Sequence, residues 1–377
     1  MPENTFFHLE GLLNRAKAPA GVSLEFVSKA KQETGKLASD LAFAGREWLN
    51  LDENTYWKGV KRPRADKSLL LPEAIVRVED AFINRFGDVV TAAGVTLGGH
   101  GFGTRPHREP IDQTRVAGSF DGVTGSILLG PRNYGHWILQ RLPRLLSITN
   151  FDSNAKLINS VWGDQSLLAQ AGFTEESIIR FPWYDDPEVF YHVDSVYLST
   201  HLAKPSTVRV MEANRLQRVV EQFTAGIPGD ESFPELLYIA RAEDDFRTGA
   251  TNKTEIRQML EERGFTTWYP AADPIAKQIQ YLRAAKVVVS EVGSQALTSM
   301  FAGPDTAVII LAPNMSVGAG GGTEFDPTWR TWQRVVCEAR GQHFAQIVCS
   351  DIPAYKEWSV EIDRVKGALD TYPHKRW

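Results

Sequence analysis

The chain has 377 residues, of which 43% are hydrophobic and 23% are charged, and its formal net charge at pH 7 is −5. These values are typical of a soluble globular protein with room for two domains. The negative net charge argues against bulk binding of nucleic acid, which normally needs a basic face. With only two cysteines, Cys337 and Cys349, the chain has neither a disulfide framework nor a cysteine-based zinc site.

Residues 1–70 are polar and predict a helical extension packed on the first domain. Residues 71–205 begin with short β-branched runs and continue as alternating strands and helices, which predicts an α/β domain. A linker-like stretch at 226–230 lies near the predicted domain boundary. Residues 206–350 repeat strands and helices at short, Rossmann-like spacing, and residues 351–377 predict a helix that can cross back to the first domain.

The sequence also predicts a cytoplasmic protein. The N-terminus lacks the basic and apolar segments of a signal peptide, and no apolar run approaches the ~20 residues of a membrane span. A basic stretch at 58–64 follows a rough amphipathic pattern at 24–51. Peripheral contact with the inner membrane face therefore stays open as an alternative to packing of this segment on its own domain.

One stretch of the first domain joins a strand end to the start of a helix. It reads Asn133-Tyr-Gly-His-Trp-Ile-Leu-Gln-Arg-Leu-Pro-Arg-Leu. Apolar residues after His136 recur at helical spacing, so His136 falls in the first helical turn. Ligands of open α/β sheets bind at such strand ends. The structural alternative is a helix that packs through Trp137 and uses His136 as a local cap.

This stretch resembles the N-Y-x-H-W-(L/I)-x-D-x-L-P-R-L signature of glycosyltransferase family 61, which includes many bacterial capsular and surface-polysaccharide proteins. Gln140 stands where the family has an acid. The matching residues are Asn133, Tyr134, His136, Trp137, Leu142, Pro143, Arg144 and Leu145.

Later segments resemble the same family in the same order, so the resemblance covers about residues 70–348. Departures from the family pattern include Ala240, Lys253 and Val292. The resembling segments are Tyr238-Ile-Ala-Arg241, Arg247, Asn252-Lys-Thr-Glu255 and residues 285–301.

The resemblance implies a GT-B arrangement, with two Rossmann-like domains facing each other across a cleft. It implies an inverting transferase that moves a sugar from a nucleotide-sugar donor to a hydroxyl of a glycan or lipid-linked glycan in polysaccharide biosynthesis. The C-terminal domain would bind the donor. The N-terminal domain would bind the acceptor, and we assign Asn133, Tyr134 and Arg144 to that side.

Two arginines are candidate ligands for the donor pyrophosphate. Arg241 ends a predicted strand and Arg247 lies in the loop that follows. A guanidinium suits a pyrophosphate because its fork of N–H groups forms paired, charge-assisted hydrogen bonds. The alternative is that both are surface arginines paired with the acidic residues 243–245.

A second strand end adds further candidates for donor binding. Gly293, Ser294 and Gln295 join a buried strand to a helix, where a phosphate can approach the backbone N–H groups, although a plain turn would look the same. Glu291 ends that strand. Its carboxylate can accept from a ribose hydroxyl or pair with a cation, and the two interpretations weigh equally.

His136 is the predicted base that deprotonates the acceptor hydroxyl. An amide at Gln140 cannot take a proton, whereas a histidine titrates near pH ~6.5. On a regular α-helix His136 and Arg144 share a face, so Arg144 can keep His136 neutral or hold an anionic substrate group. Asp121 and Glu109 are competing bases, and His136 as a mere hydrogen-bonding residue is the structural alternative.

Neither a metal nor another cofactor is expected. The acidic runs 185–186 and 243–245 lack the apolar strand that precedes an Asp-x-Asp metal site, and no His-Glu-x-x-His occurs. Gln140 and Val292 keep open a catalytically weak sugar-binding or assembly subunit. A nicotinamide-dependent oxidoreductase is disfavoured because no Gly-x-Gly-x-x-Gly opens a helix.

Overall fold

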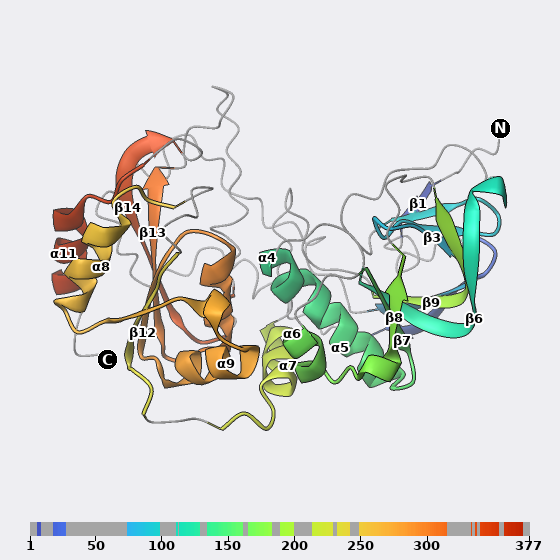
Figure 1. Ribbon diagram of the computed structural model, residues 1–377, viewed down its shortest axis with the longest axis horizontal. Helices are drawn as coiled ribbons and strands as arrows, with labels where there is room; N and C mark the ends of the chain where they lie inside the picture. The colour runs from blue at the N-terminus through green and yellow to red at the C-terminus, as the bar shows by residue number, and fades with distance from the viewer. Residues whose placement is uncertain are drawn as a thin grey trace. The chain divides into compact units, whose positions relative to one another are not determined.

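The structure is a computed structural model, and it forms two compact units (Figure 1). The first unit holds residues 1–34 and 70–202, and the second holds residues 35–69 and 203–377. Both are mixed α/β structures, which confirms the predicted α/β class. The residues that the structure describes are 6–8, 18–27, 74–98, 111, 113–128, 134–160, 165–182, 189–199, 213–228, 232–241, 249–314, 333, 336–337, 340–353 and 358–371.

A nine-stranded mixed sheet forms the first unit, in the order β1-β5-β4-β3-β9-β6-β7-β8 with β2 paired to β3. The pairs that join β5, β4, β3 and β9 are antiparallel, as is the pair of β2 with β3. The edge strand β1 is parallel to β5, and the strands from β9 to β8 are parallel to one another. The strands are β1 (Phe6–His8), β2 (Val22–Val27), β3 (Ala74–Ile83), β4 (Val89–Thr91), β5 (Thr96–Gly98), β6 (Val116–Leu128), β7 (Lys156–Ser160), β8 (Ile178–Phe181) and β9 (Phe190–Ser199).

Helices connect the parallel strands of this unit, as parallel pairing requires. The connection from β6 to β7 is the predicted signature helix, and α6 joins β7 to β8. Two short 3₁₀ turns precede β6 and β8. The helical elements are η2 (Gln113–Arg115), α4 (Tyr134–His136), the π-helix η3 (Trp137–Arg141), α5 (Leu142–Phe151), α6 (Gln165–Gln170) and η4 (Glu175–Ser177).

The second unit contains a five-stranded parallel sheet in the order β11-β10-β12-β13-β14. Its central strand β12 reads Val-Val-Val-Ser-Glu and is buried along its whole length, as expected of a parallel strand covered on both faces. The elements are α7 (Ala213–Phe223), β10 (Leu236–Ile239), α8 (Lys253–Glu261), β11 (Thr266–Trp268), η5 (Pro270–Ala272), α9 (Ile275–Ala284), β12 (Val287–Glu291), η6 (Ser294–Phe301), β13 (Ala307–Asn314), β14 (His343–Pro353) and α11 (Ile362–Thr371).

Side chains alternate along β13 and seal both faces of this sheet. Ile309 packs on the side of α8 and α11, with Met259 and Val365. Ile310 packs on the opposite side, with Ala296 of η6 and residue 337. Figure 1 shows α8 and α11 beside each other next to β14. The unit is therefore doubly wound, as the spacing of its sequence predicted.

The start of the chain differs from expectation. Residues 22–27 form a strand where an amphipathic helical pattern was expected, because they pair antiparallel with β3. At the other end, the C-terminal helix α11 packs on the second unit. Trp358 and Val365 join the core of the second unit, and the carbonyl of Trp358 accepts a hydrogen bond of 2.8 Å from the N–H of Thr251.

No helix within the described ranges combines the length and the apolar character that a membrane crossing needs.

Candidate functional site

The chain path through the second unit marks one place on its sheet. β10 leads through α8 to β11 on one side, and β12 leads through η6 to β13 on the other side. Their connections diverge, so the carboxyl ends of β10 and β12 lie at the topological switch point. In open α/β sheets, ligands bind outside such a point. Arg241 follows β10 and Glu291 ends β12, so two predicted donor-site residues meet there.

Glu291 has a fully buried side chain with two hydrogen-bond donors. Its Oε2 accepts from the N–H of Ala250 at 2.6 Å, and its Oε1 accepts from the hydroxyl of Tyr238 at 3.3 Å. Nη2 of Arg241 donates to the carbonyl oxygen of Val292 at 3.0 Å. These bonds join Arg241, Tyr238 and Ala250 to the end of β12.

Two glycines, Gly249 and Gly293, leave room for the side chains of Arg241, Lys253 and Glu291 because they carry no Cβ. A Cβ on Gly293 would lie 1.7 Å from Nη2 of Arg241, and the φ of Gly293 is +150°. A Cβ on Gly249 would lie 3.1 Å from Oε2 of Glu291 and 2.9 Å from Cε of Lys253. The guanidinium thus lies against bare backbone, and only glycine fits at position 293.

Burial is the main influence on the pKa values of Glu291 and of its hydrogen-bond partner Tyr238. Burial raises the pKa of the Glu291 carboxyl, while the N–H of Ala250 and the positive charges of Arg241 and Lys253 oppose that rise. Burial, followed by the charge of Glu291, raises the pKa of the Tyr238 hydroxyl. Tyr238 therefore stays a neutral donor to Glu291.

The turn after β12 leads directly into η6. Ser294 and Gln295 are half-buried in its first turn, and η6 is a 3₁₀ helix rather than an α-helix. Nε2 of Gln295 is buried and has no hydrogen-bond partner in the described part of the chain. A buried amide without a partner is costly unless a ligand or water accepts from it. Of the predicted donor residues after β12, Gly293 lies against Arg241, and Ser294 and Gln295 follow it in the chain.

The signature helix of the first unit is not one regular α-helix. Residues Trp137–Arg141 adopt π-helical geometry between α4 and α5. Pro143 supplies the reason, because proline has no N–H and its ring collides with the carbonyl four residues earlier in an α-helix. The wider turn shifts the faces derived from α-helical spacing. π-Helical turns occur frequently at functional sites.

The structure describes only some of the predicted residues of this region. Tyr134 is half-buried at the start of α4, and Arg144 is half-buried in α5. The backbone of His136 ends α4, but its side chain, like that of Gln140, lies outside the described residues. The predicted residues Asn133, Arg247 and Glu109 also lie outside them.

Two kinds of residue escaped prediction from the sequence. Tyr238 and Ala250 bond to Glu291, and Gly249 leaves room beside its carboxylate, in an arrangement that sequence spacing does not reveal. Arg141 is 8% exposed in η3, and burial lowers its pKa to about 10. Arg141 could have been proposed from the sequence because it lies within the signature stretch.

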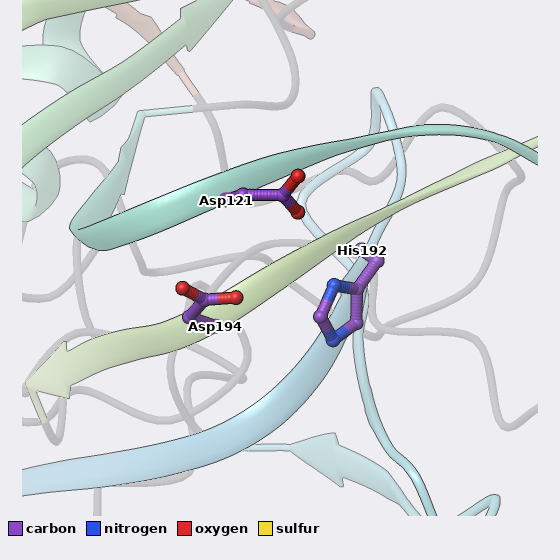
Figure 2. Close-up of side chains that lie close together, drawn as sticks. All are labelled: Asp121, His192 and Asp194. Carbon is purple, nitrogen blue, oxygen red and sulfur yellow. The ribbon is translucent and has the colours of Figure 1, made fainter.

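Asp121, predicted as a competing base, lies on β6 beside two residues of β9. A ligand atom of Asp121 and those of His192 and Asp194 all lie within 4.8 Å of one another (Figure 2). One imidazole and two carboxylates are groups that can hold a metal ion. This set was not predicted from the sequence.

An open doubly wound sheet with an arginine at its switch point is the setting in which α/β proteins bind ligands. Comparison with known families makes the class specific, since residues 134–309 match the family described as Glycosyltransferase 61. The match covers slightly less than half of the chain, from the first residue of α4 into β13, and includes Arg241 and Glu291. The matched segment is similar to glycosyltransferase family 61, which supports a glycosyltransferase enzyme and the predicted family resemblance. No curated protein matches the chain.

Proposed function

We propose that the protein transfers a sugar from a nucleotide-sugar donor to a hydroxyl of a glycan acceptor, with inversion at the anomeric carbon. The donor diphosphate binds at the switch point between β10 and β12. The single observation that carries this assignment is the guanidinium of Arg241 held against Gly293 at that point.

The switch point offers the groups that a diphosphate needs. Arg241 supplies a permanent positive charge and a rigid set of N–H donors. Gly293 opens the backbone beside it, and the adjacent start of η6 directs N–H groups outward from the turn. Ser294, Gln295 and Arg247 complete the proposed donor site. Positive groups at the diphosphate also stabilise the charge that develops as it leaves.

Two roles of Glu291 are compatible with this proposal. Its carboxylate is buried and bonded to Ala250 and Tyr238, which suits a residue that holds the chain around Ala250 at the end of β12. Acceptance from a ribose hydroxyl, the role proposed from the sequence, requires that one of these oxygens also reach the donor. The pH dependence of protein stability reports on the first of these roles.

Acceptor chemistry is assigned to the signature helix. We propose His136 as the base that takes the proton of the acceptor hydroxyl, with Asn133, Tyr134 and Arg144 binding the acceptor. Arg141, which is buried in the same helix, adds a positive charge nearby in the sequence. Inversion by direct displacement needs one such base and no covalent intermediate on the protein.

The family resemblance supports three further parts of the proposal. The two domains, residues 71–205 and 206–350, are Rossmann-like and form a GT-B arrangement. The protein acts in bacterial capsular or surface polysaccharide synthesis, and its acceptor is a lipid-linked glycan. A cytoplasmic location with peripheral membrane contact through the basic stretch 58–64 fits such an acceptor. We propose that neither a metal nor another cofactor takes part in the transfer.

A thermal-shift screen of nucleotide sugars tests the donor assignment. A ligand present at a hundred times its Kd stabilises the folded protein by about 2.7 kcal/mol. We expect one nucleotide class to raise the melting temperature of the wild type, with a much smaller rise for Arg241→Ala. Equal shifts in both proteins would place nucleotide binding away from the switch point.

Gln140 in place of the family acid supports a second candidate, a catalytically weak sugar-binding or assembly subunit. Nucleotide-sugar binding without turnover of any donor, tested with acceptor glycans and free water as acceptors, would favour that candidate. Release of nucleoside diphosphate from the donor that binds would exclude it.

A further inference from the structure

Three metal-binding side chains gather on the sheet of the first unit. His192 and Asp194 are two positions apart on β9, so they project from the same face of that strand. Asp121 lies on the neighbouring strand β6. The three ligand atoms lie within 4.8 Å of one another, and Figure 2 shows the side chains converging on a common space.

A break in the strand register brings Asp121 to this place. Phe120 pairs with Val193 and Thr124 pairs with Ser195, so three residues of β6 lie opposite Asp194 alone. The N–H of Gly122, inside this bulge, donates to Oδ2 of Asp194 at 2.5 Å. Bulges redirect side chains and are frequent beside functional sites. The bulge therefore directs one carboxylate toward another, which by itself is electrostatically unfavourable.

The imidazole of His192 is oriented from two sides. Its ring packs against Phe82 at a centroid distance of 5.4 Å, and Oδ1 of Asp80 lies 3.6 Å from Nε2. A carboxylate on one ring nitrogen commonly orients a metal-binding histidine and selects the other nitrogen as the ligand. Here that other nitrogen is Nδ1, and the ring in Figure 2 presents it on the side of Asp121 and Asp194.

The geometry points to a binding site for one divalent transition-metal ion, held by Asp121, His192 and Asp194 with Asp80 as the outer partner of the histidine. One imidazole nitrogen and two carboxylate oxygens suit Zn²⁺ or Mn²⁺, whereas Mg²⁺ and Ca²⁺ prefer oxygen ligands alone. Metal–ligand bonds of about 2.0–2.2 Å require the three groups to close in slightly. Asp121 and Asp194 are exposed, so their side chains can rotate to do so.

The site follows from ligand chemistry and does not depend on the proposed transfer reaction. A dication between the two carboxylates would offset their mutual repulsion, and three protein ligands leave positions for water.

Isothermal titration of the full-length protein with ZnCl₂, and the visible absorption of added CoCl₂, test the proposal. We expect one ion per chain at this site, and a loss of at least ~10-fold in affinity for His192→Ala and for Asp194→Asn. Glu176→Gln, an exposed carboxylate change elsewhere in the same unit, should bind as the wild type does. Asp80→Asn should weaken binding less than His192→Ala does, because Asp80 acts through the histidine.

Circular dichroism must show that each variant is folded. If His192→Ala is not, Asp121→Asn decides, because that side chain is exposed and the change is isosteric. Absence of Zn²⁺ binding by the wild type up to millimolar concentration would overturn the proposal. So would equal Zn²⁺ affinity in the wild type and in the folded ligand variants, which would show that the ion binds elsewhere.

Discussion

The guanidinium of Arg241 lies so close to the backbone of Gly293 that a Cβ at position 293 would lie 1.7 Å from Nη2. The two residues are far apart in the sequence and follow neighbouring strands of one parallel sheet. The hydrogen bond from Nη2 to the carbonyl of Val292 holds the guanidinium in that position. Any side chain at position 293 must therefore displace the arginine.

Gly293→Ala tests this relationship. The φ of +150° is unsuited to alanine, so we expect a loss of roughly 1–3 kcal/mol in the free energy of unfolding. Displacement of Arg241 should also remove most of the nucleotide affinity. Gly226→Ala is the matched control, since Gly226 has a positive φ but nothing within 4 Å of an added methyl group. A folded Gly293→Ala protein with unchanged nucleotide affinity would contradict the proposed donor site.

The positions of Arg241 and Gly293 in the fold could be predicted from the sequence, whereas the hydrogen bonds around them could not. β12 was predictable because a run of β-branched residues between a helix and a glycine turn fits a buried parallel strand. Arg241 and Gly293 were predictable because both follow strand ends. The bond from Ala250 to Glu291 was not, since its partners are 41 positions apart and meet only through sheet packing.

The signature helix contains a second feature that the sequence did not predict. Its start at Tyr134 follows from apolar spacing, yet the π-helical residues Trp137–Arg141 do not, because apolar spacing alone does not distinguish a π turn from an α turn. Pro143 was visible in the sequence and could have indicated an interruption. The metal-binding set on β6 and β9 was hidden for another reason, since a register break brings Asp121 to His192.

Arg241→Ala should weaken nucleotide binding by roughly 1.5–3 kcal/mol, because a hydrogen-bonded charge is removed. Isothermal titration with the nucleotide identified in the thermal screen measures this directly. Arg263→Ala is a suitable control, since Arg263 pairs with Asp370 at the surface of the same unit. Wild-type affinity in a folded Arg241→Ala protein would assign the arginine a structural role only.

Glu291→Gln should change how stability depends on pH. Burial raises the pKa of Glu291 in the folded protein, so the folded state holds its proton more tightly than the unfolded state does. The wild-type free energy of unfolding should therefore fall as the pH rises from about 4.3, the unfolded value, through the raised folded value. Above that window the full cost of the buried charge remains.

The glutamine amide of the Glu291→Gln variant avoids this cost, because its oxygen can accept from Ala250 and its NH₂ group can donate to Tyr238. We therefore expect the stability of the variant, relative to the wild type, to increase as the pH rises across the window. Urea unfolding at a series of pH values measures the difference. Glu262→Gln, a change at an exposed carboxylate of the same unit, should show no comparable trend. A flat difference between Glu291→Gln and the wild type would mean that burial of this carboxylate costs nothing.

Turnover should persist in EDTA after dialysis, because the proposed donor site relies on arginine and backbone N–H groups for the diphosphate. Activity that is lost in EDTA and restored by Mn²⁺ would overturn metal-independent transfer. His192→Ala then separates two explanations. If that variant loses the Mn²⁺ response, the ion concerned is the one proposed between β6 and β9, and otherwise it binds at the donor.

His136→Ala should lower kcat by roughly 10²–10⁴-fold if His136 is the base, with nucleotide affinity unchanged. The reason is that Gln140 cannot accept the acceptor proton, which leaves the histidine as the titratable group at the start of the helix. Single-turnover assays with saturating donor measure the chemical step, and calorimetry confirms donor binding. Asp121→Asn and Glu109→Gln, assayed in parallel, should each reduce kcat less than His136→Ala does. A loss below about tenfold in a folded His136→Ala protein falls short of general-base catalysis, and whichever carboxylate variant then shows the larger loss identifies the base.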